Sequence, residues 1–245
     1  MNDADLIAAL RGADDVLRAT DPATLDLPVP TCLGWTVADL IGHMSGVQRW
    51  ARGIVLAPTG ERVRRPVVDL PTGAALIEYF ADGADALVET FTTADLDREV
   101  DAFVGPRPAR WWLRRQTHEA VIHAWDRQRA TGEKLMALDP AVASDGIDEL
   151  LGLLVDPRSV DTEVFAVDGE SIHVHATDVE GEWMVRLAPG SIMITREHAK
   201  GDLALRGPAA DLLAVLSSRS PIEGTGIETF GSLDLLDRYR TSATM

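Results

Sequence analysis

The sequence predicts a helical N-terminal domain followed by a smaller α+β domain. Up to about residue 155, apolar residues recur every three or four positions, which is typical of amphipathic helices packed in a bundle. After Pro157 the period changes to two, which indicates short strands, and further helical segments follow these strands. We therefore expect a helical domain over residues 1–157 and an α+β domain over residues 158–245.

Local sequence signals place the ends of the expected helices. The first 20 residues predict an amphipathic helix with an acidic cap. Thr36 followed by Asp39 gives the second helix a start similar to a capping box. Pro108 suits the first turn of the fourth helix, and Gly132 suits its end. The apolar stripes of the second to fifth helices run through residues 37–51, 76–91, about 108–129 and 143–154.

The C-terminal domain shows the alternation of apolar and polar residues that is typical of strands. This alternation is strict over residues 171–177, and turn residues separate it from the segments that follow. A helix is expected from Pro208 through Leu216, and a last short helix over 233–239. Further strands are expected over residues 182–187, 192–195 and 203–206.

The composition limits the classes of partner. The chain has 245 residues, of which 46% are hydrophobic, and a formal net charge of −16. This charge repels phosphate backbones, so nucleic acid is not expected as a partner. No apolar run is long enough to span a membrane and no signal sequence is visible, so a cytoplasmic location is expected. The single cysteine, Cys32, excludes internal disulfides and suits a reducing compartment.

Three side chains offer ligands for a divalent metal ion. Glu119 and His123 are four residues apart on a predicted helix, so they project about 40° apart on one face. His43, on the second predicted helix, is the third candidate ligand. Two imidazoles and one carboxylate suit zinc and leave a coordination position free for a reacting group, which points to a metalloenzyme. Spacing alone leaves equally open a surface Glu–His pair that is unrelated to His43.

Other polar residues near these positions have simpler interpretations. His118 is five residues from His123, about 140° round the helix, so it is expected in the packed core and not at the metal. Asp126 follows His123 by three residues and either orients that imidazole or is an ordinary surface carboxylate. Cys32 is only a weak candidate for a nucleophile.

Further candidates for ligand binding lie outside the helix faces. His173 and His175 share one face of a predicted strand and could chelate a metal, but a solvated strand face is the favoured interpretation. Arg219 closes a predicted helix, where it could bind a substrate carboxylate bidentately or favour the dipole of the helix. A turn-rich loop between the second and third helices holds three arginines, Arg62, Arg64 and Arg65.

Four segments carry a family resemblance. They are GWTVADLIGHMSG, RWWLRRQTHEAVIHAWDRQRATG, IHVHATDVEGEWMV, and LRGPAADLLAVLSSRS followed by IETFGSLDLLDRY. In this order and spacing they resemble the mycothiol-dependent maleylpyruvate isomerase family, which is part of the DinB-like metal-binding superfamily. The segments run from about residue 33 nearly to the C-terminus and so cover both expected domains.

The resemblance implies a DinB-like four-helix bundle followed by a small α+β domain similar to sterol carrier proteins. It implies a divalent metal, usually zinc, bound by His43, Glu119 and His123. It also implies a catalytic arginine in the C-terminal domain, for which Arg219 is the best candidate. The implied cofactor is mycothiol, a thiol of actinobacteria, and the scarcity of lysine beside many arginines agrees with a GC-rich actinobacterial genome.

The expected function is activation of a thiol at the metal for cis–trans isomerisation of, or S-transfer to, a small electrophilic substrate. Arg62, Arg64 and Arg65 are candidates for binding the thiol cofactor, and the chain is expected to be a monomer or a homodimer. Two other functions stay open. A metal-dependent hydrolase would use the same three ligands to activate water, and a non-catalytic protein would bind a small ligand without turnover.

Overall fold

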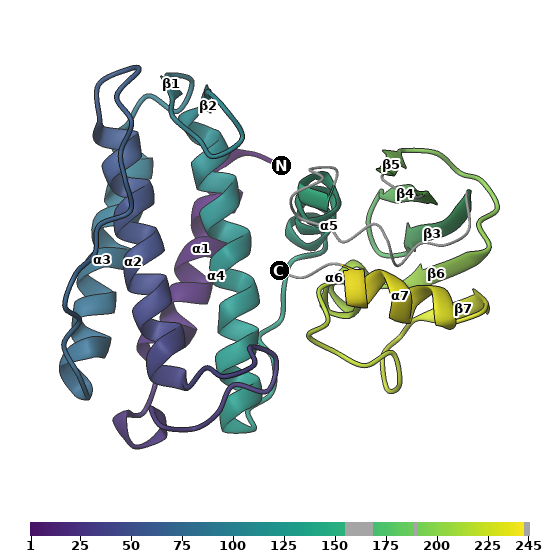
Figure 1. Ribbon diagram of the computed structural model, residues 1–245, viewed down its shortest axis with the longest axis horizontal. Coiled ribbons are helices and arrows are strands. Elements are labelled where there is room, and N and C mark those ends of the chain that lie inside the picture. Colours follow the sequence, from purple (N-terminus) through teal and green to yellow (C-terminus); the bar gives the residue numbers. More distant parts are fainter. Residues whose placement is uncertain (155–168, 189–190, 243–245) are drawn as a thin grey trace. The chain divides into compact units, whose positions relative to one another are not determined.

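Four long helices form the first part of the chain in the computed structural model, which describes residues 1–154, 169–188 and 191–242. Each helix packs mainly against two others, because α1 and α2 both contact α3 and α4. This arrangement encloses one apolar core, as the predicted amphipathic stripes require. The four helices are α1 (Asp3–Arg18), α2 (Val37–Leu56), α3 (Ala74–Thr93) and α4 (Ala109–Thr131) (Figure 1).

The predicted helix ends are confirmed at α2 and α4. The Thr36 hydroxyl accepts a hydrogen bond from the backbone N–H of Asp39 at 3.2 Å, and the Asp39 carboxylate accepts one from the N–H of Thr36 at 2.8 Å. This reciprocal pair satisfies two backbone donors that the helix itself leaves without partners. Gly132 ends α4 with a φ of 73°, a left-handed conformation that glycine adopts without steric strain.

The bundle core combines large side chains from all four helices. Leu10, Met44, Phe80 and Trp112, one from each helix, are at most 1% exposed. Burial of such a side chain contributes roughly 1.5–3 kcal/mol relative to leaving it in water. Between α3 and α4 lies a short β1–β2 pair (Glu99–Val100 with Arg107–Pro108), and a 3-10 turn covers Pro22–Thr24, neither of which the sequence predicted.

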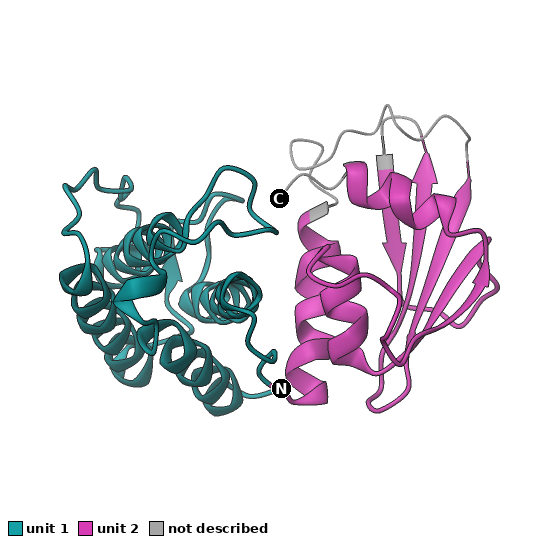
Figure 2. Cartoon of the chain, turned by 90° about the horizontal axis from the view of Figure 1, so that it is seen from below, with its two compact units in different colours: residues 1–136 teal, residues 137–245 magenta. Residues whose placement is uncertain are grey.

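The fifth predicted helix, α5 (Pro140–Leu154), belongs by its contacts to the second part of the chain. The chain divides into compact units over residues 1–136 and 137–245 (Figure 2), and α5 packs against α6 (Ala209–Leu216). The division therefore differs from the expected boundary at 157/158, which lies outside the described residues. An apolar stripe shows that a helix needs a partner, but the stripe does not identify the partner.

The second unit is a five-stranded sheet with helices against it. The strand order is β5-β4-β3-β6-β7, antiparallel except where β3 pairs with β6. The strands are β3 (Glu170–Ala176), β4 (Glu182–Ala188), β5 (Ser191–Thr195), β6 (Leu203–Gly207) and β7 (Glu228–Gly231). All but β7 were predicted. The four residues of β7 are exposed at the sheet edge, so they lack the apolar alternation that marks a strand.

Helices α5 and α6 cover one face of this sheet (Figure 2). Alternate residues of the central strands, among them Ile172, Val174 and Leu205, are fully buried, as expected for the covered face. The last helix, α7 (Asp234–Ser242), is joined to α6 through Arg240, whose guanidinium donates to the carbonyl oxygen of Val215. Within the described part of the chain, no helix is long and apolar enough to cross a membrane.

One buried acid lies in the bundle core without a cationic partner in direct contact. Asp14 of α1 is 0% exposed, and its Oδ1 accepts a hydrogen bond from Nε2 of Gln48 on α2 at 2.7 Å. The other oxygen of each side chain, Asp14 Oδ2 and Gln48 Oε1, has no hydrogen-bond partner among the described residues. Burial raises the pKa of Asp14 to about 7, although the hydrogen bond from Gln48 opposes the shift.

We predict that Asp14→Asn removes a pH dependence from stability. The folded pKa of about 7 exceeds the ordinary value of 3.8, so the stability that Asp14 contributes is full below about pH 4 and is lost as the pH rises through 7. Between about pH 5 and about pH 8, the free energy of unfolding of wild type should fall by about 2–3 kcal/mol more than that of the variant. Urea unfolding at both pH values measures this difference. Asp15→Asn, at an exposed neighbour, is the control, and identical pH dependence in wild type and Asp14→Asn would contradict the assignment.

Candidate metal centre

The packing of α2 against α4 brings the three predicted ligands together. Nε2 of His43 lies 3.0 Å from Oε1 of Glu119, and Nε2 of His123 lies 3.5 Å from the same oxygen. The three ligand atoms all lie within 4.8 Å of one another. The interpretation of Glu119 and His123 as a surface pair unrelated to His43 is therefore wrong.

The three side chains are mostly buried but not sealed. The side chain of His43 is 21% exposed, that of Glu119 18% and that of His123 10%. Two imidazole nitrogens and one carboxylate oxygen form a donor set that fits zinc, and a three-residue set leaves room in the coordination sphere for a small molecule from solvent. On its geometry and its chemistry the cluster therefore fits a divalent metal.

Asp126 orients the imidazole of His123. Its Oδ2 lies 2.9 Å from Nδ1 of His123, so Nδ1–H donates to the carboxylate and Nε2 is the nitrogen on the side of Glu119. Asp126 is 0% exposed, which excludes the alternative of a surface carboxylate. Its carboxylate also accepts hydrogen bonds from Thr31 Oγ1 at 2.5 Å and from Cys32 Sγ at 3.4 Å, so the segment before α2 is tied to α4 at this point.

Two neighbours of the cluster were missed in the sequence. Arg115 donates from its guanidinium to Oε2 of Glu119, the oxygen that does not face the histidines. The i,i+4 spacing of Arg115 and Glu119 on one helix was the signal that could have found this pair. The ring of Trp35 lies 4.9 Å from that of His43 and 6.1 Å from that of His123, measured between centroids, and no local pattern predicts this contact.

The many buried polar residues of α4 agree with a functional site on this helix. Seven of its fourteen buried residues are polar: Gln116, Thr117, His118, His123, Asp126, Arg127 and Gln128. Burying such residues costs free energy unless they are hydrogen-bonded. A helix that buries many of them departs from the usual apolar pattern of a core helix, and such departures are expected at functional sites. His118 is 4% exposed, which confirms its prediction as a core residue, and it does not belong to the group of three potential ligands.

The electrostatic surroundings of the two histidines differ. Burial lowers the pKa of His43 to about 3, and the positive charges of His123, Arg65 and Arg115 act in the same direction. Burial also acts to lower the pKa of His123, but its contacts with Asp126 and Cys32 outweigh this and raise the pKa above the ordinary value. His43 is consequently neutral at physiological pH, the form in which an imidazole binds a metal.

Of the three predicted cofactor arginines, Arg65 contacts a residue of the cluster. Arg65 donates to the backbone oxygen of His43 at 3.3 Å, and Trp50 Nε1 donates to the backbone oxygen of Val63 at 2.8 Å, which holds the loop along α2. Gly46 permits the approach, because a Cβ there would lie 3.0 Å from the guanidinium of Arg65. A cavity of about 330 Å³ is lined by all three loop arginines, Arg62, Arg64 and Arg65, together with residues that include Trp50 and Phe103.

The predicted catalytic arginine, Arg219, lies in the second unit, just after α6. Ser218 precedes it with a φ of 62°, a left-handed conformation that reverses the chain at the end of the helix. The backbone N–H of Arg219 then donates to the carbonyl oxygen of Ala214 at 2.7 Å, and its guanidinium donates to that of Ser217, also at 2.7 Å. The half-buried side chain thus caps the helix end.

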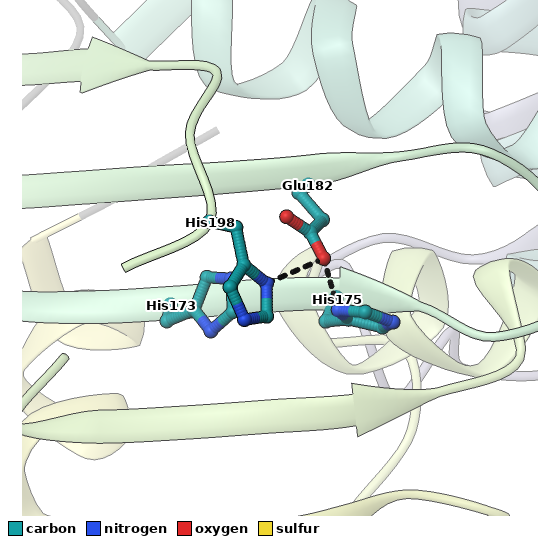
Figure 3. Close-up of side chains that lie close together, drawn as sticks. All are labelled: His173, His175, Glu182 and His198. Carbon is teal, nitrogen blue, oxygen red and sulfur yellow. Dashed lines mark hydrogen bonds and ion pairs between the residues drawn. The ribbon is translucent and has the colours of Figure 1, made fainter. Parts of the chain in front are cut away.

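A second group of potential metal ligands lies on the sheet of the second unit (Figure 3). It contains His173 and His175, for which a solvated strand face was the favoured interpretation. That interpretation is wrong for His173, which is only 8% exposed, whereas the side chain of His175 is 28% exposed. The other members are Glu182 and His198, whose closeness to the strand histidines no local sequence pattern indicates.

Two family models match the chain, one in each unit. A family model described as the mycothiol maleylpyruvate isomerase N-terminal domain matches residues 6–128, and the model of the MDMPI C-terminal domain matches residues 141–238. The gap between the two matches contains the division at 136/137 and not the expected boundary at 157/158. None of the curated proteins matches the chain.

Solved structures share the whole fold. A crystal structure of the mycothiol-dependent maleylpyruvate isomerase aligns with a TM-score of 0.60 at 15% identity, covering 94% of this chain and 93% of that chain. A histidine-to-alanine mutant of a mycothiol-dependent maleylpyruvate isomerase aligns with a TM-score of 0.62 at 16% identity, with the same coverage. At such identities the likeness supports the fold: a helical unit followed by an α+β unit. Because the two family models together match most of its length, the chain belongs to the mycothiol maleylpyruvate isomerase family.

Proposed function

We propose that this chain is a mycothiol-dependent metalloenzyme that activates a thiol at His43, Glu119 and His123. The convergence of two imidazole Nε2 atoms on one oxygen of Glu119 is the observation that carries the proposal. A zinc-class ion held there would stabilise the thiolate, the reactive form of a thiol, at neutral pH. Its substrate would be a small electrophile with an activated double bond, such as maleylpyruvate.

The surrounding residues prepare the three ligands. Asp126 holds the proton on Nδ1 of His123 and so leaves Nε2 free to bind. Arg115 occupies Oε2 of Glu119, which fixes the carboxylate and directs Oε1 toward the histidines. Arg65, at the backbone of His43, adds a second positive charge close to where a thiolate would bind, and the 330 Å³ cavity beside it would accept part of the thiol cofactor.

The proposed reaction needs no oxidant or reductant. The thiolate sulfur forms a bond to one alkene carbon, and the π electron pair moves onto the electron-withdrawing group that activates the alkene. Rotation about the resulting single bond follows. Return of the electron pair then expels the thiolate and leaves the trans isomer. In an S-transfer reaction, the same adduct takes up a proton and leaves as a conjugate. Arg219 is the candidate that binds a carboxylate of the substrate.

We predict that His43→Ala and Glu119→Gln each lose the metal ion of the bundle. Glu119→Gln removes the anionic ligand, so zinc affinity should fall by more than the roughly 10- to 100-fold typical of losing an outer hydrogen-bond partner. Elemental analysis and competition with a coloured chelator measure stoichiometry and affinity. Glu89→Gln, at an exposed position on α3, is the matched control. Wild-type affinity in Glu119→Gln would show that the coordination is different.

Turnover should require mycothiol. We expect the zinc-loaded protein to convert maleylpyruvate to its trans isomer, or to consume another small electrophile, only when mycothiol is present, with a rate that saturates in thiol. The assay is absorbance or product analysis with and without the thiol. Turnover of esters or amides without thiol would instead support a metal-dependent hydrolase. Saturable binding with no turnover of any electrophile would support a non-catalytic binding protein.

Replacement of Arg219 should separate catalysis from metal binding. Arg219→Ala is expected to keep full metal content while lowering kcat on the order of 10²-fold, because a charged donor to the reacting substrate is lost. Arg219→Lys should recover part of the rate. Arg206→Ala, which removes an exposed arginine paired with Glu228 in the same unit, is the control. If Arg219→Ala has wild-type kcat and KM, Arg219 only caps the helix.

A further inference from the structure

Three histidines and one glutamate gather on the face of the sheet opposite α5 and α6. His175 on β3 and Glu182 on β4 are direct cross-strand partners, and His173 is two residues before His175 on the same face of β3. His198 comes from the segment that follows β5, and Figure 3 shows its ring beside those of the strand histidines. Potential ligand atoms of all four side chains lie within 4.8 Å of one another.

Glu182 is the centre of this cluster, which we call the sheet cluster (His173, His175, Glu182, His198). Its Oε1 contacts Nδ1 of His175, and it lies 2.9 Å from Nδ1 of His198. Among the described residues, the ion pairs of Glu182 are with imidazoles only. The neighbouring arginines are paired elsewhere, Arg186 with Glu197 and Arg196 with Asp148. The carboxylate therefore has no fixed cation to balance its charge when the histidines are neutral.

His173 belongs to this group although its Nε2 makes no hydrogen bond there. The residue is only 8% exposed, and its buried Nε2 has no hydrogen-bond partner among the residues that the structure describes. The ring centroid of His173 lies 5.6 Å from that of His198 and 6.0 Å from that of His175. A buried nitrogen without a partner costs free energy, so three imidazoles around one carboxylate are better explained if a ligand occupies the space between them.

The donor set identifies the class of that ligand. Imidazole nitrogen suits zinc, copper and nickel, and one carboxylate oxygen completes a four-ligand set without a thiolate. Ligands on a tetrahedral zinc ion are about 3.4 Å apart at the usual bond lengths of about 2.1 Å. The sheet cluster needs only small side-chain movements to reach this spacing. His198 can make the largest of them, since its side chain is 78% exposed.

We propose that the sheet cluster binds one zinc-class divalent ion at a site separate from the bundle centre. All four ligands belong to the second unit, so the site is complete without any residue of the bundle. The bound ion would fasten the segment of residues 196–200 to β3 and β4. Because four protein ligands close the coordination sphere, the role is structural, in contrast to the three-ligand bundle centre.

Metal stoichiometry of the full-length chain, without a polyhistidine tag, tests this site. Wild type dialysed against a small excess of zinc should bind two ions, and His198→Ala and His43→Ala one each. The double variant should bind none. Lys200→Ala, at an exposed position on the same segment, is the control and should bind two. His198→Ala changes an exposed side chain, so circular dichroism should show an intact fold, and Glu182→Gln provides a second, independent loss of a ligand.

The outcomes separate this site from the proposed function. If His198→Ala and Glu182→Gln bind as many zinc ions as wild type, with affinities unchanged to within about twofold, the sheet site is overturned. If these variants lose one ion while His43→Ala loses none, the sheet site stands and the bundle centre fails. Hydrogen exchange adds a readout of the structural role. Zinc should slow amide exchange over residues 196–200 in wild type but not in His198→Ala, and equal exchange with and without zinc in wild type would refute that role.

Discussion

The contact between α2 and α4 is the constraint on which the candidate metal centre depends. His43 and Glu119 are 76 positions apart in the chain, and only the packing of these two helices brings their side chains to 3.0 Å. A densely packed core leaves side chains little freedom to move, so the buried apolar residues of the bundle also set the geometry of the polar cluster. The fold and the site therefore rest on the same contact.

The three potential ligands of the bundle centre are held in place by residues that hydrogen-bond to them. The inner layer is the pair of imidazoles and the Glu119 carboxylate, and the next consists of Asp126 and Arg115, each hydrogen-bonded to one of these groups. Asp126 in turn accepts hydrogen bonds from Thr31 and Cys32, which belong to the segment before α2. This segment and α4 thus meet at a single buried carboxylate, which restricts the movement of His123.

The sequence could predict what is decided locally. Helix ends followed from Thr36, Asp39 and Gly132, whose side chains or backbone conformations act within one turn. The i,i+4 relation of Glu119 and His123 likewise depends on one helix alone. His43 was a candidate from its residue type alone, and its place beside Glu119 and His123 stayed open, because spacing along the chain carries no information on which helices pack together.

What escaped prediction depends on tertiary packing. The stripe of α5 indicated a helix but not its partner α6, so it could not show that α5 belongs to the compact unit of residues 137–245. Alternation in β3 put His173 and His175 on one face, but it could not show that the segment around Gly201 covers His173. A Cβ on Gly201 would lie 2.8 Å from the backbone nitrogen of His173, which shows how closely this segment approaches the strand.

The positions of Arg65 and Arg115 have a consequence for how the protein meets anions in solution. The chain as a whole carries a formal charge of −16, yet both arginines contribute to lowering the pKa of His43, so two fixed positive charges lie near this ligand. The net charge of the chain repels small anions, whereas these two guanidinium groups attract an anion that comes close to His43. Dissolved salt screens such fields over about 8 Å at physiological ionic strength. The attraction of an anion to Arg65 and Arg115 therefore opposes the repulsion by the net charge of the chain, and both effects are strongest in dilute buffer.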